Sequence, residues 1–199
     1  MTRTAYSLPT IDLSLWDKRG KPDAAFLDSL RLAAHEYGFF YLKGHGIPLS
    51  LNADLLRQAQ HFFSLSLEQK EQIAMVHSPH FRGYNRAGLE LTRGRQDWRE
   101  QIDIGSEKAA LTDLEDKPAY LRLQGPNQWP EALPDFKKTV LAWPEQTLNV
   151  LRQLLAALSL SLAHEKTAFH PVVIDAPYLL LKLIHSPGSP TNNDGQGVG

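Results

Sequence analysis

The stretch that decides the fold reads Glu36-Tyr37-Gly38-Phe39-Phe40-Tyr41-Leu42-Lys43-Gly44-His45-Gly46-Ile47-Pro48. Its centre, residues 39–43, is a run of aromatic and aliphatic side chains, which predicts a buried strand. The segment 44–48 predicts a tight turn that leads out of this strand. Gly38 suits the left-handed position at the C-terminal end of a preceding helix. The stretch therefore marks a junction between a helix and a strand.

The residues before this junction predict a strand and then a helix. Residues 11–15, Ile-Asp-Leu-Ser-Leu, alternate apolar and polar side chains, as is typical of a short half-buried strand. After the turn at Gly20 and Pro22, Asp23 is suited to cap a helix. The residues that share the inner face of this helix, at steps of four, three and four, are Phe26, Leu30, Ala33 and Tyr37.

The residues after the junction predict two helices and then a region rich in loops. A helix is expected over residues 50–64, and Ser66-Leu67-Glu68-Gln69 matches the capping box at the start of another. Residues 76–105 predict loops and short strands, and within them residues 97–100 predict a solvated strand edge with internal ion pairs. The expected inner side of the first helix consists of Leu55, Leu56, Ala59, Phe62 and Phe63.

The last third of the chain predicts a connector, a long helix and a strand. Residues 117–134 are rich in turn-forming side chains. A long helix follows, and Pro144 is expected to kink or divide it. Residues 178–184 predict a strong buried strand, and residues 187–199 predict a loop. The apolar stripe of the long helix consists of Leu148, Leu151, Leu155, Leu158 and Leu162.

Composition excludes several classes of function. The 199 residues, 42% hydrophobic and 22% charged, are typical of one globular domain or a little more. Lys and Arg number 21 against 22 Asp and Glu, so no basic field attracts nucleic acid or an anionic membrane. Zero cysteines exclude a disulfide scaffold, a thiolate zinc site and a cysteine nucleophile. The N-terminus lacks an apolar signal segment, which predicts a soluble, cytoplasmic protein without a membrane span.

The spacing of the eight histidines does not match a local metal motif. An iron facial triad commonly takes His-x-Asp or His-x-Glu from one strand, and no histidine here has a carboxylate two residues later. His77 and His80 flank Pro79, which favours an exposed loop over a metal-binding helix. The glycines of residues 195–199 are not followed by the helix that a phosphate loop requires. No nucleophile elbow is present, so serine hydrolase chemistry has no support.

Residues 81–86, Phe-Arg-Gly-Tyr-Asn-Arg, combine cationic groups, a phenol and a flexible glycine. This composition suits the binding of a carboxylate, because guanidinium groups form paired hydrogen bonds with carboxylates. A charged turn is the alternative interpretation, and the residues alone favour it.

The order of several segments resembles the isopenicillin N synthase-like family of iron(II)/2-oxoglutarate-dependent oxygenases. Residues 36–48 resemble the family's GFF-x-x-x-NHGI segment, and residues 62–70 are similar to its FF-x-LP-x-E-x-K segment. Further pieces match in order, and the resemblance spans essentially the whole chain. These pieces are Leu8 to Leu13, Arg82-Gly83-Tyr84, Glu90, Thr92, Gly94, Asp97, Glu100, Ile104-Gly105, residues 125–130 and residues 183–187.

The resemblance implies an α+β fold, with N-terminal helices packed on a double-stranded β-helix, or jelly-roll, core that is incomplete in this chain. It divides the chain into an N-terminal non-haem dioxygenase-type region, residues 1–115, and a second part, residues 116–199. The second part holds the connector, the long helix and the first strands of the oxygenase core, truncated before the metal ligands. Iron(II) and 2-oxoglutarate are the implied cofactors, and their principal ligands are expected beyond Gly199.

Four residues of this chain take roles from the resemblance. Arg82 and Tyr84 match the region that approaches the prime substrate, and Lys182 and Ser186 lie on the strand that lines the 2-oxoglutarate pocket. Ser186 departs from the tyrosine usual at this position, and Lys43 departs from the usual asparagine. No catalytic or metal-binding residue is expected within the 199 residues.

The resemblance implies an oxidoreductase, a dioxygenase that hydroxylates, desaturates or cyclises a small molecule. The present chain alone is expected to lack this activity. The alternative is a non-catalytic binding or interaction module of the same fold. It predicts self-association through uncovered apolar residues such as Leu179, Leu181 and Leu183, unless another segment completes the sheet.

Overall fold

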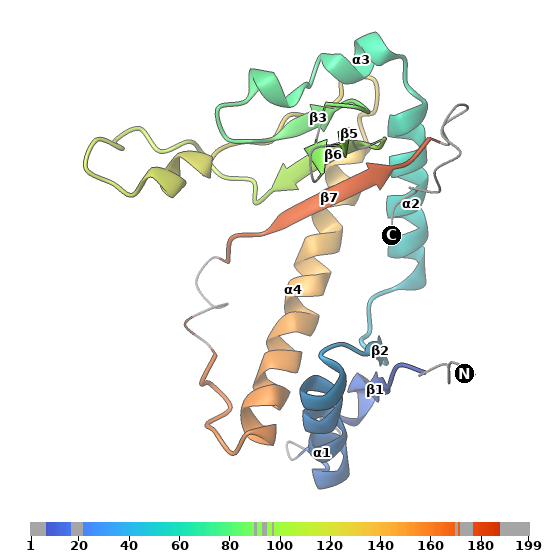
Figure 1. Cartoon of the computed structure of the whole chain (residues 1–199), viewed down its shortest axis with the longest axis vertical. Helices are drawn as coiled ribbons and strands as arrows, with labels where there is room; N and C mark the ends of the chain where they lie inside the picture. Colours follow the sequence, from blue (N-terminus) through green and yellow to red (C-terminus); the bar gives the residue numbers. More distant parts are fainter. Residues whose placement is uncertain are drawn as a thin grey trace. The chain divides into compact units, whose positions relative to one another are not determined.

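The computed structural model describes residues 7–16, 22–89, 91–92, 95–96, 98–169, 171 and 177–187 (Figure 1). The chain forms two compact units, one from Met1–Leu49 with Trp143–Pro177 and the other from Ser50–Ala142 with Tyr178–Gly199. Each unit takes residues from both sides of position 115, and the division at that position stays a prediction. None of the described helices combines the length and apolarity needed to cross a bilayer.

The first unit contains a parallel pair of short strands and helix α1. β1 (Thr10–Asp12) pairs with β2 (Tyr41–Lys43). α1 (Ala24–Leu32) begins where the Asp23 carboxylate accepts the amide of Ala25, and it continues as a π-helical turn over Ala33–Tyr37. Gly38 follows with φ 76°, which confirms its predicted left-handed position. The core of this unit consists of Ile11, Leu13, Trp16, Phe26, Leu30, Ala33, Val150, Ala156 and Ala157.

Three predictions for this unit need correction. Tyr37, expected on the inner face of the helix, is 42% exposed. The alternating strand expected over residues 11–15 ends at Asp12, because its carboxylate accepts hydrogen bonds from Ser14 and a 3₁₀ turn follows over Leu13–Leu15. The run 39–43 is only half buried, since successive side chains of a strand point to opposite faces. Leu42 packs on the core, whereas Phe39 and Tyr41 are 64% and 63% exposed.

The second unit contains a three-stranded antiparallel sheet, in the order β3–β6–β7 among the described residues. Its strands are β3 (Gly83–Asn85), β6 (Glu100–Gly105) and β7 (Leu180–His185). α2 (Leu49–Ser64) confirms the predicted helix, although Leu56 is exposed rather than inside. α3 (Leu67–Glu71) begins at the predicted capping box of Ser66 and Gln69. β4 (Leu91–Thr92) and β5 (Arg95–Gln96) form a separate antiparallel pair.

The long helix α4 (Phe136–Ser161) runs without interruption through Pro144, so the expected division of this helix is wrong. Four leucines of the predicted stripe are half buried, whereas Leu162 lies just after α4 and is 50% exposed. The buried positions of α4 include Val150, Ala156 and Ala157. The predicted connector holds one 3₁₀ turn, Ala119–Leu123. Residues 188–199, predicted as a loop, lie outside the described residues.

β7 confirms the predicted final strand but not its burial. β6 is buried along its whole length because it has a neighbour on each side, whereas β7 pairs only with β6 in the described sheet. Leu180 and Ile184 are 48% and 44% exposed, and the half-buried positions of β7 are Leu181 and Leu183. The exposed aliphatic residues of β7 are therefore Leu180 and Ile184, whereas the sequence analysis expected Leu181 and Leu183 to be uncovered.

Candidate functional site

Three of the four residues that the resemblance singles out lie on the sheet β3–β6–β7 or directly after one of its strands. Tyr84 lies on β3, Lys182 lies on β7, and Ser186 directly follows β7. The two faces of this sheet differ in chemistry. One face packs Tyr84 against Phe62 of α2, which also contacts Phe136 of α4, with ring centroids 5.9 and 5.4 Å apart. The other, here called the polar face, carries Gln101, Asp103 and Lys182 together with the aliphatic Leu180 and Ile184.

A buried carboxylate, Glu100, links four elements on the aromatic face. Its Oε2 accepts a hydrogen bond from Lys70 Nζ of α3 at 2.7 Å and one from the Tyr84 hydroxyl of β3 at 2.5 Å. Its Oε1 lies 2.8 Å from His185 Nδ1 of β7. Glu100 and Lys70 are 7% and 8% exposed, so water screens this cluster weakly. The predicted solvated strand edge over residues 97–100 is therefore wrong at Glu100.

Burial and hydrogen bonding act in opposite directions on Glu100. Desolvation raises the pKa of its carboxyl, but the hydrogen bonds from Lys70, Tyr84 and His185 outweigh this effect and lower the pKa below its ordinary value. Burial, together with the bond to the Glu100 carboxylate, raises the pKa of the Tyr84 phenol. Glu100 is therefore ionised and Tyr84 is neutral at neutral pH.

The polar face of the sheet holds a second ion pair. Lys182 Nζ lies 3.3 Å from Oδ1 of Asp103, and the Gln101 amide donates to Oδ2 of the same carboxylate at 3.0 Å. Asp103 and Gln101 are each 1% exposed, whereas the Lys182 side chain is 33% exposed. The cation of this pair is thus the member that solvent or a ligand reaches.

Arg82 lies inside the fold, at 1% exposure. Its guanidinium donates to the carbonyl oxygens of His80, Phe81 and Leu123 and to the Tyr178 hydroxyl, at 2.8 to 3.3 Å. It also covers Gly105, where a Cβ atom would overlap the guanidinium. In the described structure, Arg82 therefore fastens the start of β3 to the connector and to the segment before β7.

Glu100, Asp103, Lys70 and His185 interact in the structure, although the sequence analysis gave none of them a role in a site. A signal for the two acids exists in β6, where they interrupt the strand Glu100-Gln101-Ile102-Asp103-Ile104-Gly105. Acids inside a buried strand require partners, because burial of an unpaired charge is strongly unfavourable. The basic partners of the two acids lie at least 30 positions away in the chain, so local patterns do not reveal them.

A hollow of about 450 Å³ lies beside Tyr84 in the same unit. It has both charged and apolar walls, and Arg86 and Glu71 face each other across 3.7 Å. Val76 is its most exposed apolar side chain. The lining residues are Glu71, Ala74, Val76, His77, Tyr84, Arg86 and Leu89.

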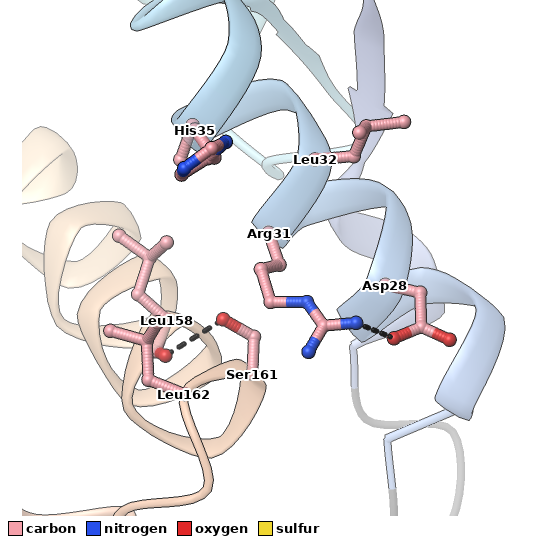
Figure 2. A pocket seen from close by; sticks show the side chains of 8 residues that line it. Asp28, Arg31, Leu32, His35, Leu158, Ser161 and Leu162 are labelled. Carbon is pink, nitrogen blue, oxygen red and sulfur yellow. Dashed lines mark hydrogen bonds and ion pairs between the residues drawn. The ribbon is translucent and has the colours of Figure 1, made fainter.

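A larger groove, of about 670 Å³, lies in the first unit between α1 and the end of α4 (Figure 2). Figure 2 shows Arg31 paired with Asp28, with Leu158 on the facing helix and Leu162 directly after its end. The walls of the groove are chiefly apolar, and it is not lined by the four candidate site residues of the sequence analysis, Arg82, Tyr84, Lys182 and Ser186. Among the described residues, no group of three or more His, Cys, Asp or Glu side chains is arranged to hold a metal ion.

Comparisons with known proteins agree with the family that the sequence motifs resemble. The family model described as non-haem dioxygenase in morphine synthesis N-terminal matches residues 8–132. A 2-oxoglutarate-dependent dioxygenase of Dothideomycetidae sp. (strain 11243) is 43% identical over 133 residues, covering 66% of this chain and 35% of the relative. A homoarginine-6-hydroxylase of Glycine max is 33% identical over 192 residues, covering 92% of this chain and 56% of the relative.

A solved structure of an oxygenase also resembles this chain in its fold. The crystal structure of a Caulobacter crescentus protein assigned to the 2OG-Fe(II) oxygenase family superposes with a TM-score of 0.75 at 25% identity. The match covers 94% of this chain and 58% of that protein. The chain therefore spans between about a third and three fifths of the length of these relatives.

Proposed function

Because this chain belongs to the non-haem, 2-oxoglutarate-dependent oxygenase family, we propose that it forms part of an enzyme that oxidises a small molecule. The reaction is a hydroxylation, desaturation or cyclisation, and the location is the cytoplasm. The sheet β3–β6–β7 is the first part of a jelly-roll core that further strands complete. The observation that carries this proposal is the polar sheet face, where Lys182 presents a partly exposed cation beside Asp103.

Lys182 and Ser186 are the proposed contacts for 2-oxoglutarate. A dicarboxylate needs a positive partner, and charge-assisted hydrogen bonds are the stronger ones in proteins. Ser186, exposed and directly after β7, offers a hydroxyl where the family resemblance implies a phenol. A serine reaches less far than a tyrosine, so Lys182 carries the larger part of the proposed binding.

Arg82 and Tyr84 are the proposed residues of the substrate region. Tyr84 lines the hollow of about 450 Å³, whose charged and apolar walls suit a small molecule of mixed polarity. Arg82 acts by holding residues 80–82 against the connector, since its terminal nitrogens donate to carbonyl and phenol oxygens of the protein. Its terminal nitrogens therefore shape this region, and its Nε, which has no hydrogen-bond partner among the described residues, is buried away from solvent.

The described residues do not fit an iron site, because they lack a set of three metal ligands. We therefore assign iron binding to none of the residues that the structure describes. A complete site would then combine the polar face described above with residues outside it.

A non-catalytic interaction module is the second candidate. The observation in its favour is the exposure of Leu180 and Ile184 on β7, at 48% and 44%. An exposed apolar strand is a template for pairing with another chain. Under this alternative the protein self-associates at micromolar concentration and does not bind 2-oxoglutarate.

The deciding experiment combines intact mass with a titration of iron(II) and 2-oxoglutarate under anaerobic conditions. A mass above 22.4 kDa with stoichiometric binding, followed by release of succinate when oxygen is admitted, supports the oxygenase. Absence of binding by a protein of that larger mass would favour the non-catalytic module. Sedimentation of the same sample then tests self-association.

A further inference from the structure

β7 has nearly the same composition on its two faces. Successive residues alternate between the faces, so one face carries Leu181, Leu183 and His185, and the other carries Leu180, Lys182 and Ile184. Each face thus has two aliphatic side chains and one basic side chain. A shift of one residue exchanges the faces of a strand, but here the aliphatic content of each face would stay the same. The apolar pattern of β7 does not select its register.

Charge pairing does distinguish the registers. In the observed pairing, Glu100 lies opposite His185 and Asp103 lies opposite Lys182, on opposite faces of the sheet. A shift of β7 by one or two residues in either direction places an aliphatic residue, Ser186 or Pro187 opposite these acids. None of these four shifts brings a base directly opposite either acid.

We infer that the two acids of β6 set the register of β7, so that Glu100 and Asp103 are positioning residues for Lys182. Both acids are buried, which makes their attraction to a base stronger and less screened than at the surface. Asp103 has the larger effect on the register of β7, because Glu100 keeps Lys70 and Tyr84 as partners in every register. The consequence for 2-oxoglutarate rests on the proposed function, in which the face of Lys182 lines the cofactor pocket.

The absence of cysteine from the sequence allows a direct test by disulfide trapping. Leu183→Cys with Ile102→Cys reports the observed register, and Leu183→Cys with Gln101→Cys reports a shift of one residue. Directly opposed residues of neighbouring strands lie at a distance that suits a disulfide. On mild oxidation, only the first pair is expected to cross-link. Gln101→Cys with Ile184→Cys is the matched control, because these residues are opposed in the observed register.

The decisive variant moves both bases by one position while the composition of β7 stays the same. It combines Leu181→Lys, Lys182→Leu, Ile184→His and His185→Ile, so that both acids meet a base only after a shift of one residue. The preference between the two reporter pairs is expected to reverse in this background. A persistent link between positions 102 and 183 would overturn the inference.

A second variant decides the question if circular dichroism shows that the first one is unfolded. Glu100→Gln with Asp103→Asn removes both acidic charges with nearly the same side-chain shape. The link between positions 101 and 183 is then expected to appear beside the native one, and its continued absence would reject the inference. These readouts need neither iron nor 2-oxoglutarate, so their failure is distinguishable from failure of the proposed function.

Discussion

Glu100 and His185 face each other directly across β6 and β7, with Oε1 of the carboxylate 2.8 Å from Nδ1 of the imidazole. Because the pKa of Glu100 is lowered and an ionised carboxylate only accepts, the imidazole donates through Nδ1. The bond joins two strands that are 85 positions apart in the chain. Together with Lys70 and Tyr84, it connects the edge of the sheet to the helical part of the unit.

Replacement of Lys70 by methionine is expected to lower the free energy of unfolding by about 3 kcal/mol. The change leaves the buried Glu100 carboxylate without its cationic partner, and breaking one side of a buried ion pair typically has an effect of this size. Urea denaturation measures the loss. Lys138→Met, an exposed position on α4, is the matched control and should change stability little. Equal stability of the two variants would contradict this role of Lys70.

Tyr84→Phe is expected to destabilise the chain by about 2 kcal/mol, as is typical for loss of a hydrogen bond to a charged group. The phenyl ring keeps its packing on Phe62, so the change in the free energy of unfolding reports the hydrogen bond that the hydroxyl donates to Glu100. Thermal or urea unfolding measures this change. Tyr120→Phe, at a position that is 68% exposed, is the control. An effect no larger than that of the control would show that the hydroxyl contributes little.

Stability is expected to fall in acid, with Glu100 as one cause. Its pKa in the folded chain lies below the ordinary value of 4.5, so its contribution is present above that pH and is lost as the pH falls through the folded value. Unfolding midpoints in urea, measured from neutral pH downwards, should show this decline. Glu100→Gln is expected to flatten the decline, and Glu115→Gln, at an exposed position, is expected to leave it unchanged. A profile of the same slope in both variants would refute the assignment.

Gly105→Ala is expected to destabilise by about 2 kcal/mol, the range for overpacking of a buried site. The new methyl group would overlap the Arg82 guanidinium, which its hydrogen bonds to three carbonyl groups hold in place. A double-mutant cycle with Arg82→Ala tests the cause. The loss of stability caused by Gly105→Ala should be smaller once the guanidinium is absent. Additive effects of the two substitutions would show that overlap with Arg82 is not the cause.

Lys182→Met is expected to weaken 2-oxoglutarate binding about tenfold, which corresponds to loss of one charge-assisted contact. Titration of the complete iron-loaded oxygenase, in which the proposed iron ligands are present, measures the change, and Lys182→Arg should restore much of the affinity. Lys138→Met serves as the control for general loss of positive charge. Unchanged affinity in Lys182→Met would remove Lys182 from the cofactor site and leave its pairing with Asp103 as its role.

Local chemistry predicted the ends of several elements correctly. The Asp23 cap, the left-handed Gly38 and the capping box of Ser66 and Gln69 each depend on atoms within a few residues, so the sequence contains all the information they need. Burial was predicted less well. Phe39, Leu56 and Leu180 are apolar yet exposed, because burial depends on which distant element covers a face.

The sequence by itself determined the order of the main helices and of the first and last strands, and through its ordered motifs it determined the family. Only the tertiary structure decided the environment of Glu100 and Asp103. Their partners are Lys70, His185 and Lys182, which come from segments far away in the chain. The physical reason is that capping and periodicity act between near neighbours, whereas an ion pair forms between any residues that the fold brings within about 4 Å.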